Sequence, residues 1–361
     1  TPKEIEGYPD LDVLPVVAIY GKNNVGKSNL IRAFKALQWL VLMSHRFQVG
    51  QELRPNETFS FDHDSQTAPT TFKIEFIAND GYQYSLLIEL TREKILREEL
   101  YKYVAGSDGR THSRKLYIRK SGQPIEFGGD FRGEKKSIEK RLLDNILFLS
   151  KGAQENHEAL KPIVLYFKEQ LEIVPLSEMY TKFQLNYLGQ ALSEESSKGK
   201  LEVIDKALTA IDTGVLGLSI TKLEELPDNI QVEVEGNSDG EEDNKVNAAK
   251  DRILDMLKHK LKAKHRFFKD LKESSIVEIP FEEESEGTQK FVALFSKFID
   301  LTESGGVFIV DELERSFHPV LTQKLIELFN NDISRSSNAQ LIFTTHATEI
   351  ISDLDRDQVF L

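Results

Sequence analysis

The stretch Val16-Val-Ala-Ile-Tyr-Gly-Lys-Asn-Asn-Val-Gly-Lys-Ser28 decides the fold of this chain. Its first five residues form an apolar run between a proline and a glycine, which predicts a short buried strand that enters a turn. After Ser28, apolar residues recur at helical spacing over residues 30–42. A strand, a glycine-rich turn and a helix in this order are typical of an α/β fold.

The turn matches the pattern Gly-x-x-x-x-Gly-Lys-Ser at every fixed position. Its glycines let backbone N–H groups turn toward a β-phosphate, its lysine neutralises β- and γ-phosphate oxygens, and its serine hydroxyl ligates Mg²⁺. The pattern arises by chance in about one percent of chains of this length, and here the required strand and helix are also present. The sequence therefore predicts a P-loop that binds ATP and Mg²⁺. The predicted contacts are Gly21, Asn23, Asn24, Gly26, Lys27, Ser28 and Asn29.

Acidic residues follow a second predicted buried strand, Val307-Phe-Ile-Val310. Asp311 is placed to bind Mg²⁺ directly or through water, and Glu312 to polarise an attacking water. Alone, the pair would be equally well explained as an acidic turn after a core strand, but a P-loop needs such an acid at the end of a neighbouring strand. His346 follows a third strand-like run, 341–343, where it either donates a hydrogen bond to the γ-phosphate or serves as a local hydrogen-bond partner.

Ser285 and Gly287 lie in a turn before an apolar helix. A helix N-terminus favours an anion through its dipole and free N–H groups, although this turn considered alone is only a helix cap. The order of the motifs along the chain is what gives the turn significance.

Composition limits the class of protein. The chain has 361 residues, no cysteine and a formal net charge of −13. Disulfides and thiolate metal sites are excluded, and a reducing cytoplasm is the expected location. No run of about 18 apolar residues is present, so no membrane partner is expected. The negative charge opposes non-specific adhesion to nucleic acid. Because the sequence starts at Thr1 and ends at Leu361 directly after a strand-like run, we expect a fragment of a longer protein.

We divide the chain into residues 1–160, with the P-loop and an antiparallel sheet, a helical insertion over 161–275, and residues 276–361, which return to α/β alternation. Three predicted strands within 70–130, separated by turn signals, indicate the antiparallel sheet. They are 72–76, 82–90 and 115–119.

Two charged segments lie within the insertion. Residues 224–243 carry nine acidic residues and no basic one, which predicts a solvated loop. Residues 250–272 are lysine-rich with an apolar face, which predicts an amphipathic helix, the returning limb of a helical arm. Its charged face is favoured as a solvated surface packed on a neighbouring helix, and a partner or nucleic-acid surface is the alternative.

The order of these motifs resembles the ATP-binding-cassette superfamily, in particular the soluble heads of SMC, RecF and OLD-type ATPases. The resemblance implies an α/β, ABC-type P-loop ATPase head with a mixed central sheet, an antiparallel β-subdomain and a helical arm. It identifies Ser285 and Gly287 with the signature motif, which caps the γ-phosphate bound by a second copy in a head-to-tail dimer. It also identifies residues 311–319 with the acidic pair and D-loop, His346 with the H-loop, and Gln154 with a Mg²⁺-contacting Q-loop glutamine.

The resemblance is closer to AAA-type ATP-binding proteins of bacterial abortive-infection and antiphage loci, the ATPase subunits of PARIS, retron and Septu systems among them. It is carried by residues 59–61, 71–76 and 147–154 in addition to the nucleotide motifs. It implies a slow, Mg²⁺-dependent ATPase that oligomerises and controls an effector protein, often a nuclease. The alternatives are a RecF- or SMC-like DNA-repair ATPase whose basic segment 250–272 touches DNA, and the ATPase portion of an OLD-type nuclease. A transporter ATPase fits least, because His318-Pro319 is typical of the soluble branch.

Overall fold

This computed structural model of the protein describes separate ranges of the chain. The residues it describes are 3–5, 8–22, 25–55, 65–66, 68–106, 110–175, 177–211, 213–225, 242–269, 273–315, 319–330, 339–352 and 354–361. Residues 59–61 of the resemblance and most of the acidic segment 224–243 lie outside them.

A five-stranded sheet forms the centre of the molecule, with the order β15-β3-β14-β13-β9 and parallel pairing throughout the described strands. Its strands are β3 (Val16–Tyr20), β9 (Leu171–Val174), β13 (Gly306–Val310), β14 (Ala339–Thr345) and β15 (Val359–Phe360). The three predicted strands of the motifs are confirmed. The sheet is parallel where a mixed one was expected, and β14 lies between the P-loop strand and the strand of the acidic pair, which are therefore not direct neighbours.

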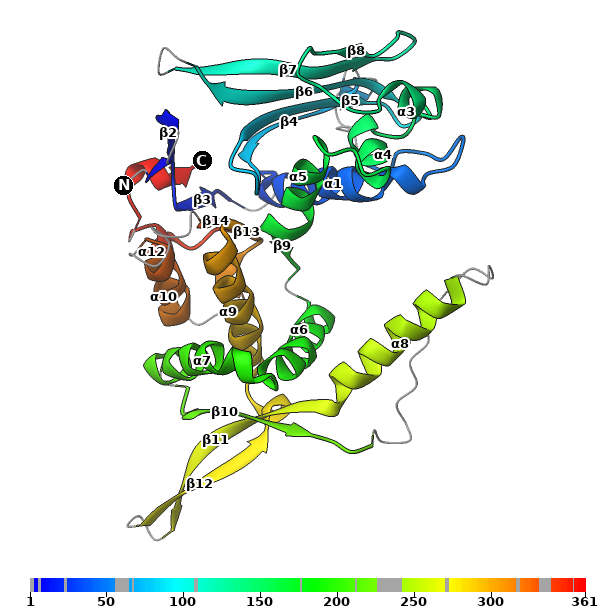
Figure 1. Ribbon diagram of the computed structural model, residues 1–361. Coiled ribbons are helices and arrows are strands. Elements are labelled where there is room, and N and C mark those ends of the chain that lie inside the picture. Colours follow the sequence, from blue (N-terminus) through cyan, green and yellow to red (C-terminus); the bar gives the residue numbers. More distant parts are fainter. Residues whose placement is uncertain are drawn as a thin grey trace.

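Both faces of this sheet are buried, which explains the continuous apolar runs of its strands. In β13, Phe308 and Val310 belong to one core cluster and Ile309 to the other. Helix α1 (Lys27–Met43) covers the face of Ile309, whereas α9 (Glu286–Ser304) and α10 (Pro319–Asn330) lie on the opposite side (Figure 1). A short helix, α12 (Thr348–Ile351), follows β14.

A second, antiparallel sheet lies beyond α1 (Figure 1). Its strands are β4 (Thr70–Ile77), β5 (Gln83–Leu90), β6 (Ile95–Ala105), β7 (Thr111–Lys120) and β8 (Glu126–Phe127). The predicted sheet is confirmed, but β6 was missed because Glu98, a charged residue, is fully buried in it. Its carboxylate accepts hydrogen bonds from the Tyr117 hydroxyl at 2.7 Å and from two backbone N–H groups at the start of α4.

Small elements complete this half of the molecule. They are β1 (Lys3–Ile5), β2 (Tyr8–Val13), α3 (Lys136–Lys140), α4 (Phe148–Gln154), α5 (Lys161–Leu165) and the π-helical turn Tyr166–Gln170. Gln38 in α1 fastens this turn, because its Nε2 donates to the carbonyls of Phe167 and Leu171 at 2.7 Å.

The segment predicted as a helical insertion, residues 161–275, contains strands as well as helices. Its elements are α6 (Glu178–Leu192), α7 (Lys198–Ala210), β10 (Gly217–Lys222), α8 (Glu242–Lys258), β11 (His259–Lys269) and β12 (Glu273–Pro280). The expected basic helix ends at Lys258, and its second half is strand β11, which pairs with β10 and β12. Leu261 and Ala263 are buried while Lys260, Lys262 and Lys264 are not, so the pattern has the two-residue period of a strand. Within the described residues, no helix has the length and apolar content needed to cross a bilayer.

Candidate nucleotide-binding site

The predicted P-loop joins β3 to α1 at the carboxyl edge of the parallel sheet. Gly26 has a φ of 102°, in the left-handed region where a side chain would be strained. Gly21 is packed closely, since a Cβ there would lie 2.9 Å from the Val25 Cγ2 atom. The local backbone therefore requires a glycine at position 26, whereas a side chain at position 21 would displace the exposed side chain of Val25.

The P-loop lysine is held against its own loop. Lys27 is 9% exposed, and its ammonium group donates to the carbonyl oxygens of Gly21 and, at 2.9 Å, of Lys22. These carbonyls place the cation at the mouth of the turn. A phosphate oxygen would be a stronger, charge-assisted acceptor for the same group.

The N-terminus of α1 offers the second set of donors. The N–H groups of Asn29 and Leu30 donate to the Gly26 carbonyl, and the N–H groups that precede them have no carbonyl acceptor within the helix. The half-buried Ser28 hydroxyl lies in this first turn. Lys27, Ser28 and the free N–H groups fit a bound phosphate and its metal ion. Asn29 is exposed, and Asn23 and Asn24 lie outside the described residues.

The acidic pair and the histidine lie at the same edge of the sheet. Tyr20 pairs with Thr345, so Gly21 and His346 follow matched ends of two neighbouring strands. On the other side of β14, Val310 pairs with Phe343, which places Asp311 level with Thr344. The structure thus gathers the P-loop, the acidic pair and the histidine that the sequence predicted.

Thr344 fixes the acidic pair and was not predicted as a site residue. Its fully buried hydroxyl donates to Asp311 Oδ1 at 2.5 Å and accepts from the Glu312 N–H at 2.7 Å. Two consecutive threonines at a buried strand end are a sequence signal for such a role, because buried hydroxyls need partners.

Glu312 has an unusual backbone conformation, with a φ of 50° in a non-glycine residue. This region costs about 1 to 2 kcal/mol for a residue with a Cβ and persists where surrounding contacts enforce it. The hydrogen bond from its N–H to Thr344 and the buried neighbour Leu313 are such contacts. The strain falls on the residue that the sequence singled out as the catalytic base.

Glu314 is a second residue that sequence reasoning missed. Its Oε1 accepts from the His346 backbone N–H at 2.8 Å and lies 2.7 Å from His346 Nδ1. The predicted D-loop continues from here into residues 316–318, which lie outside the described part of the chain.

The predicted signature turn is well formed but lies elsewhere. Ser285 caps α9, since its hydroxyl accepts from the Thr288 N–H at 3.1 Å, and Gly287 lies in the first turn of the helix. α9 has 19 residues and is therefore about 28 Å long, and its far end leads into β13. Its N-terminus lies near α6, α7 and β11, away from the sheet (Figure 1). One chain therefore does not bring Ser285 to its own P-loop.

Gln154 is not brought to the P-loop either. It ends α4, where its Oε1 accepts from Lys151 Nζ at 2.9 Å. The preceding turn of α4 contacts the far end of α1, since Ser150 Oγ accepts from the His45 N–H at 3.1 Å. The 17 residues of α1 separate that end from the P-loop by about 25 Å. This geometry removes Gln154 from the set of candidate Mg²⁺ ligands.

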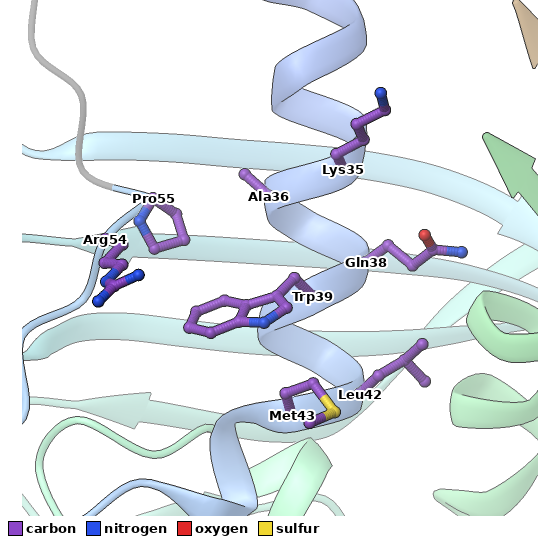
Figure 2. A pocket seen from close by; sticks show the side chains of 8 residues that line it. All are labelled: Lys35, Ala36, Gln38, Trp39, Leu42, Met43, Arg54 and Pro55. Atoms are coloured by element: carbon purple, nitrogen blue, oxygen red, sulfur yellow. The ribbon is translucent and has the colours of Figure 1, made fainter. Parts of the chain in front are cut away.

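A pocket of about 580 Å³ opens beside the C-terminal half of α1 and is not part of this site. Figure 2 shows Trp39 and Met43 on the helix and Arg54 and Pro55 on the segment that follows it. The lining residues that belong to α1 begin at Lys35, two or more helical turns away from Lys27.

The fold and the gathered motifs are those of a P-loop nucleotide-binding domain. A model of the family described as "AAA domain, putative AbiEii toxin, Type IV TA system" matches residues 16–352, and the chain belongs to this family. No curated protein matches the chain.

Solved SMC heads are among the similar structures. An Smc head bound to the C-winged helix domain of ScpA has a TM-score of 0.37 and 13% identity, and the match covers 99% of this chain and 94% of that one. The SMC head domain of Thermotoga maritima has a TM-score of 0.32 and 13% identity, with coverages of 98% and 90%. A Pyrococcus furiosus Smc head bound to the C-terminal domain of ScpA has a TM-score of 0.31 and 12% identity, with coverages of 99% and 93%.

Proposed function

We propose that this protein is a Mg²⁺-dependent ATPase of the cytoplasm whose active site is completed by a second copy of the chain. One observation supports this above all. The P-loop, Asp311, Glu312 and His346 meet at one edge of the sheet, whereas Ser285 lies a helix length away on the same chain.

Each residue has a role that follows from its chemistry. Lys27 and the N–H groups of α1 hold the β- and γ-phosphates, and Ser28 and Asp311 are the candidate metal ligands. Mg²⁺ supplies charge neutralisation between the phosphates when it is bound. Thr344 holds Asp311 in place, and Glu312 polarises the attacking water.

The second copy would supply Ser285 and the N-terminus of α9 to the γ-phosphate in a head-to-tail dimer. The turn is rigid enough for this task, because Gln289 Nε2 donates to the carbonyls of Glu282 and Glu284 at 3.0 and 2.8 Å. Such a dimer closes around ATP and opens after hydrolysis, so ATP would report the assembly state.

Nucleotide-dependent dimerisation tests this proposal. Glu312→Gln should retain ATP and stall turnover, and it should sediment as a dimer or higher oligomer with Mg²⁺ and ATP. Lys27→Ala is the matched control: it should not bind ATP, and its sedimentation should be the same with and without Mg²⁺ and ATP. A Glu312→Gln protein that binds ATP and stays monomeric at tens of micromolar would contradict the composite site.

We further propose that this ATPase controls an effector protein, a nuclease or another toxin, in antiphage defence. The family description, which names a putative toxin and a type IV toxin–antitoxin system, supports a role of this kind. The test is affinity purification of the chain expressed from its native locus, with Lys27→Ala beside it. Recovery of a neighbouring gene product that depends on Lys27 supports the proposal, and purification of the ATPase alone counts against it.

DNA repair is the second candidate, and one observation favours it. Lys260, Lys262, Lys264 and Arg266 alternate along β11 on the face opposite the buried Leu261 and Ala263. Alternate residues of a strand lie about 6.6 Å apart, so these side chains form a row of four cations. Acidic groups lie near the row, since Lys260 pairs with Glu282 at 3.2 Å and Glu278 lies opposite Lys264 in the sheet.

Salt-dependent DNA binding decides between the two candidates. DNA affinity falls as salt rises, and the slope of the logarithm of the association constant against the logarithm of the salt concentration measures the number of phosphate contacts. Charge reversal of Lys262, Lys264 and Arg266 should reduce the magnitude of this slope by about three if all three residues contact phosphates. Reversal of the exposed Lys73, Lys94 and Lys120 on the other sheet is the control of equal charge. Equal effects of both variants, or no DNA binding at low salt, would exclude the DNA-repair candidate.

A further inference from the structure

Glu314 lies beneath His346 in the site and makes its described polar contacts with that residue. The Glu314 side chain is 14% exposed and that of His346 is 43% exposed, so the carboxylate lies in the protein and the imidazole faces outward. The second carboxylate oxygen, Oε2, is buried and has no partner among the described residues. A buried carboxylate oxygen without a donor is costly, so packing alone does not explain this position.

Both contacts use the same oxygen and constrain both the main chain and the ring of His346. Oε1 accepts from the backbone N–H at 2.8 Å and lies 2.7 Å from Nδ1. The first contact is a hydrogen bond that fixes where the chain leaves β14, and the second is a close polar contact that brings the Nδ1 edge of the imidazole to the carboxylate. The acceptor itself is anchored, because the adjacent Leu313 is fully buried.

The chemistry of the pair assigns the two ring nitrogens. An ionised carboxylate only accepts hydrogen bonds, so the Nδ1 that faces it carries a proton. Nε2 is then the ring nitrogen that is left to contact a ligand. A ring that donates from Nε2 as well carries a positive charge, which would make its bond to a phosphate oxygen charge-assisted.

We propose that Glu314 is a positioning residue that holds His346 with Nδ1–H turned inward, so that Nε2 faces the γ-phosphate of bound ATP. This inference rests on the proposed ATPase function. It adds a third acidic residue to the site, with a role distinct from metal binding by Asp311 and water activation by Glu312.

Turnover of a variant series tests the positioning role. Glu314→Gln keeps an oxygen that can accept from the His346 backbone N–H and remain beside Nδ1, so its kcat should stay within about threefold of wild type. Glu314→Ala frees the ring, and its kcat should fall by about 10- to 100-fold with a smaller change in KM. His346→Ala should fall similarly, and the double variant should be no slower than the slower single variant, because both changes remove one interaction.

A readout without ATP separates this inference from the ATPase proposal. The ring nitrogens of the eight histidines are observed by ¹H–¹⁵N NMR of the nucleotide-free protein, and His346 is assigned by the signal lost in His346→Gln. Wild type and Glu314→Gln should show a protonated Nδ1, and Glu314→Ala should shift His346 toward the Nε2–H tautomer. A wild-type protein without ATPase activity would defeat the proposed function and leave this measurement intact.

Two results would overturn the inference. One is an identical His346 ring spectrum in wild type and Glu314→Ala. The other is a double variant whose loss of kcat equals the product of the two single losses, which would show that Glu314 acts independently of His346. Thermal melting of every variant checks that each chain is folded.

Discussion

Replacement of Thr344 by valine should damage both stability and turnover, because one buried hydroxyl orders the acidic pair. The hydroxyl donates to Asp311 Oδ1 at 2.5 Å and accepts from the Glu312 N–H at 2.7 Å. Valine has nearly the same volume and makes neither bond, so it leaves a carboxylate oxygen and an N–H group without this partner.

The size of the effect follows from these two bonds. A lost bond to a charged group and an unpaired buried N–H group each cost about 1 to 3 kcal/mol. Asp311 is half-buried and water can replace part of its bond, so we expect a total loss of about 2 to 4 kcal/mol in the free energy of unfolding. Displacement of Asp311 and Glu312 by about 1 Å should lower kcat by about 100-fold.

Thr344→Ser is the matched control, because it keeps the hydroxyl and loses one methyl group. It should cost about 1 kcal/mol and leave kcat close to wild type. Urea denaturation gives the free energy of unfolding, and steady-state phosphate release gives kcat. Equal values of both quantities for the valine and serine variants would refute the role assigned to the hydroxyl.

Further predictions concern the P-loop, the strained glutamate and a buried histidine. Lys27→Ala should weaken ATP binding by at least about tenfold, since it removes a charge-assisted contact, as measured by calorimetry. Glu312→Gly should relieve the positive φ and stabilise the fold by about 1 kcal/mol in urea denaturation, yet abolish measurable turnover, so a destabilised variant would argue against strain at this residue. Burial lowers the pKa of His157, whose ring stacks on Phe131 at 4.4 Å. As the pH falls, His157 is protonated at a higher pH in the unfolded chain than in the folded one. The free energy of unfolding should therefore be greatest above about pH 6.5 and should decrease as the pH falls below this value. His157→Phe should flatten that dependence in melts between pH 5 and 8, and an unchanged profile would exclude His157 as its cause.

The nucleotide motifs could be predicted from the sequence because each is local. Residues 16–28 need one strand, one turn and one helix, and all three are set by neighbouring residues. The same holds for the strand before Asp311. What local patterns do not give is the strand order, and β14 was therefore not expected between β3 and β13.

The elements that the sequence did not predict share one property: each depends on contacts between residues far apart in the chain. The 250–272 segment keeps apolar residues at helical spacing as far as Leu257, but its continuation is fixed as a strand by β10 and β12 on either side. Strand β6 was not predicted because it contains the charged residue Glu98. The hydrogen-bond donors that allow Glu98 to be buried come from β7 and α4, 19 to 51 residues away. Thr344 and Glu314 are likewise identified by contacts across about 30 residues.

The separation of Ser285 from the P-loop is the central feature of the proposed site, and mixing two inactive variants tests it most directly. Lys27→Ala retains a working signature turn, and Ser285→Arg retains a working P-loop. In a mixed dimer, one of the two sites contains both intact parts. Each variant alone should be inactive, and an equimolar mixture should recover a measurable part of wild-type ATPase activity, because each mixed dimer has one intact site. Full activity of Ser285→Arg alone, or no recovery in a mixture shown to contain mixed dimers, would contradict the composite site.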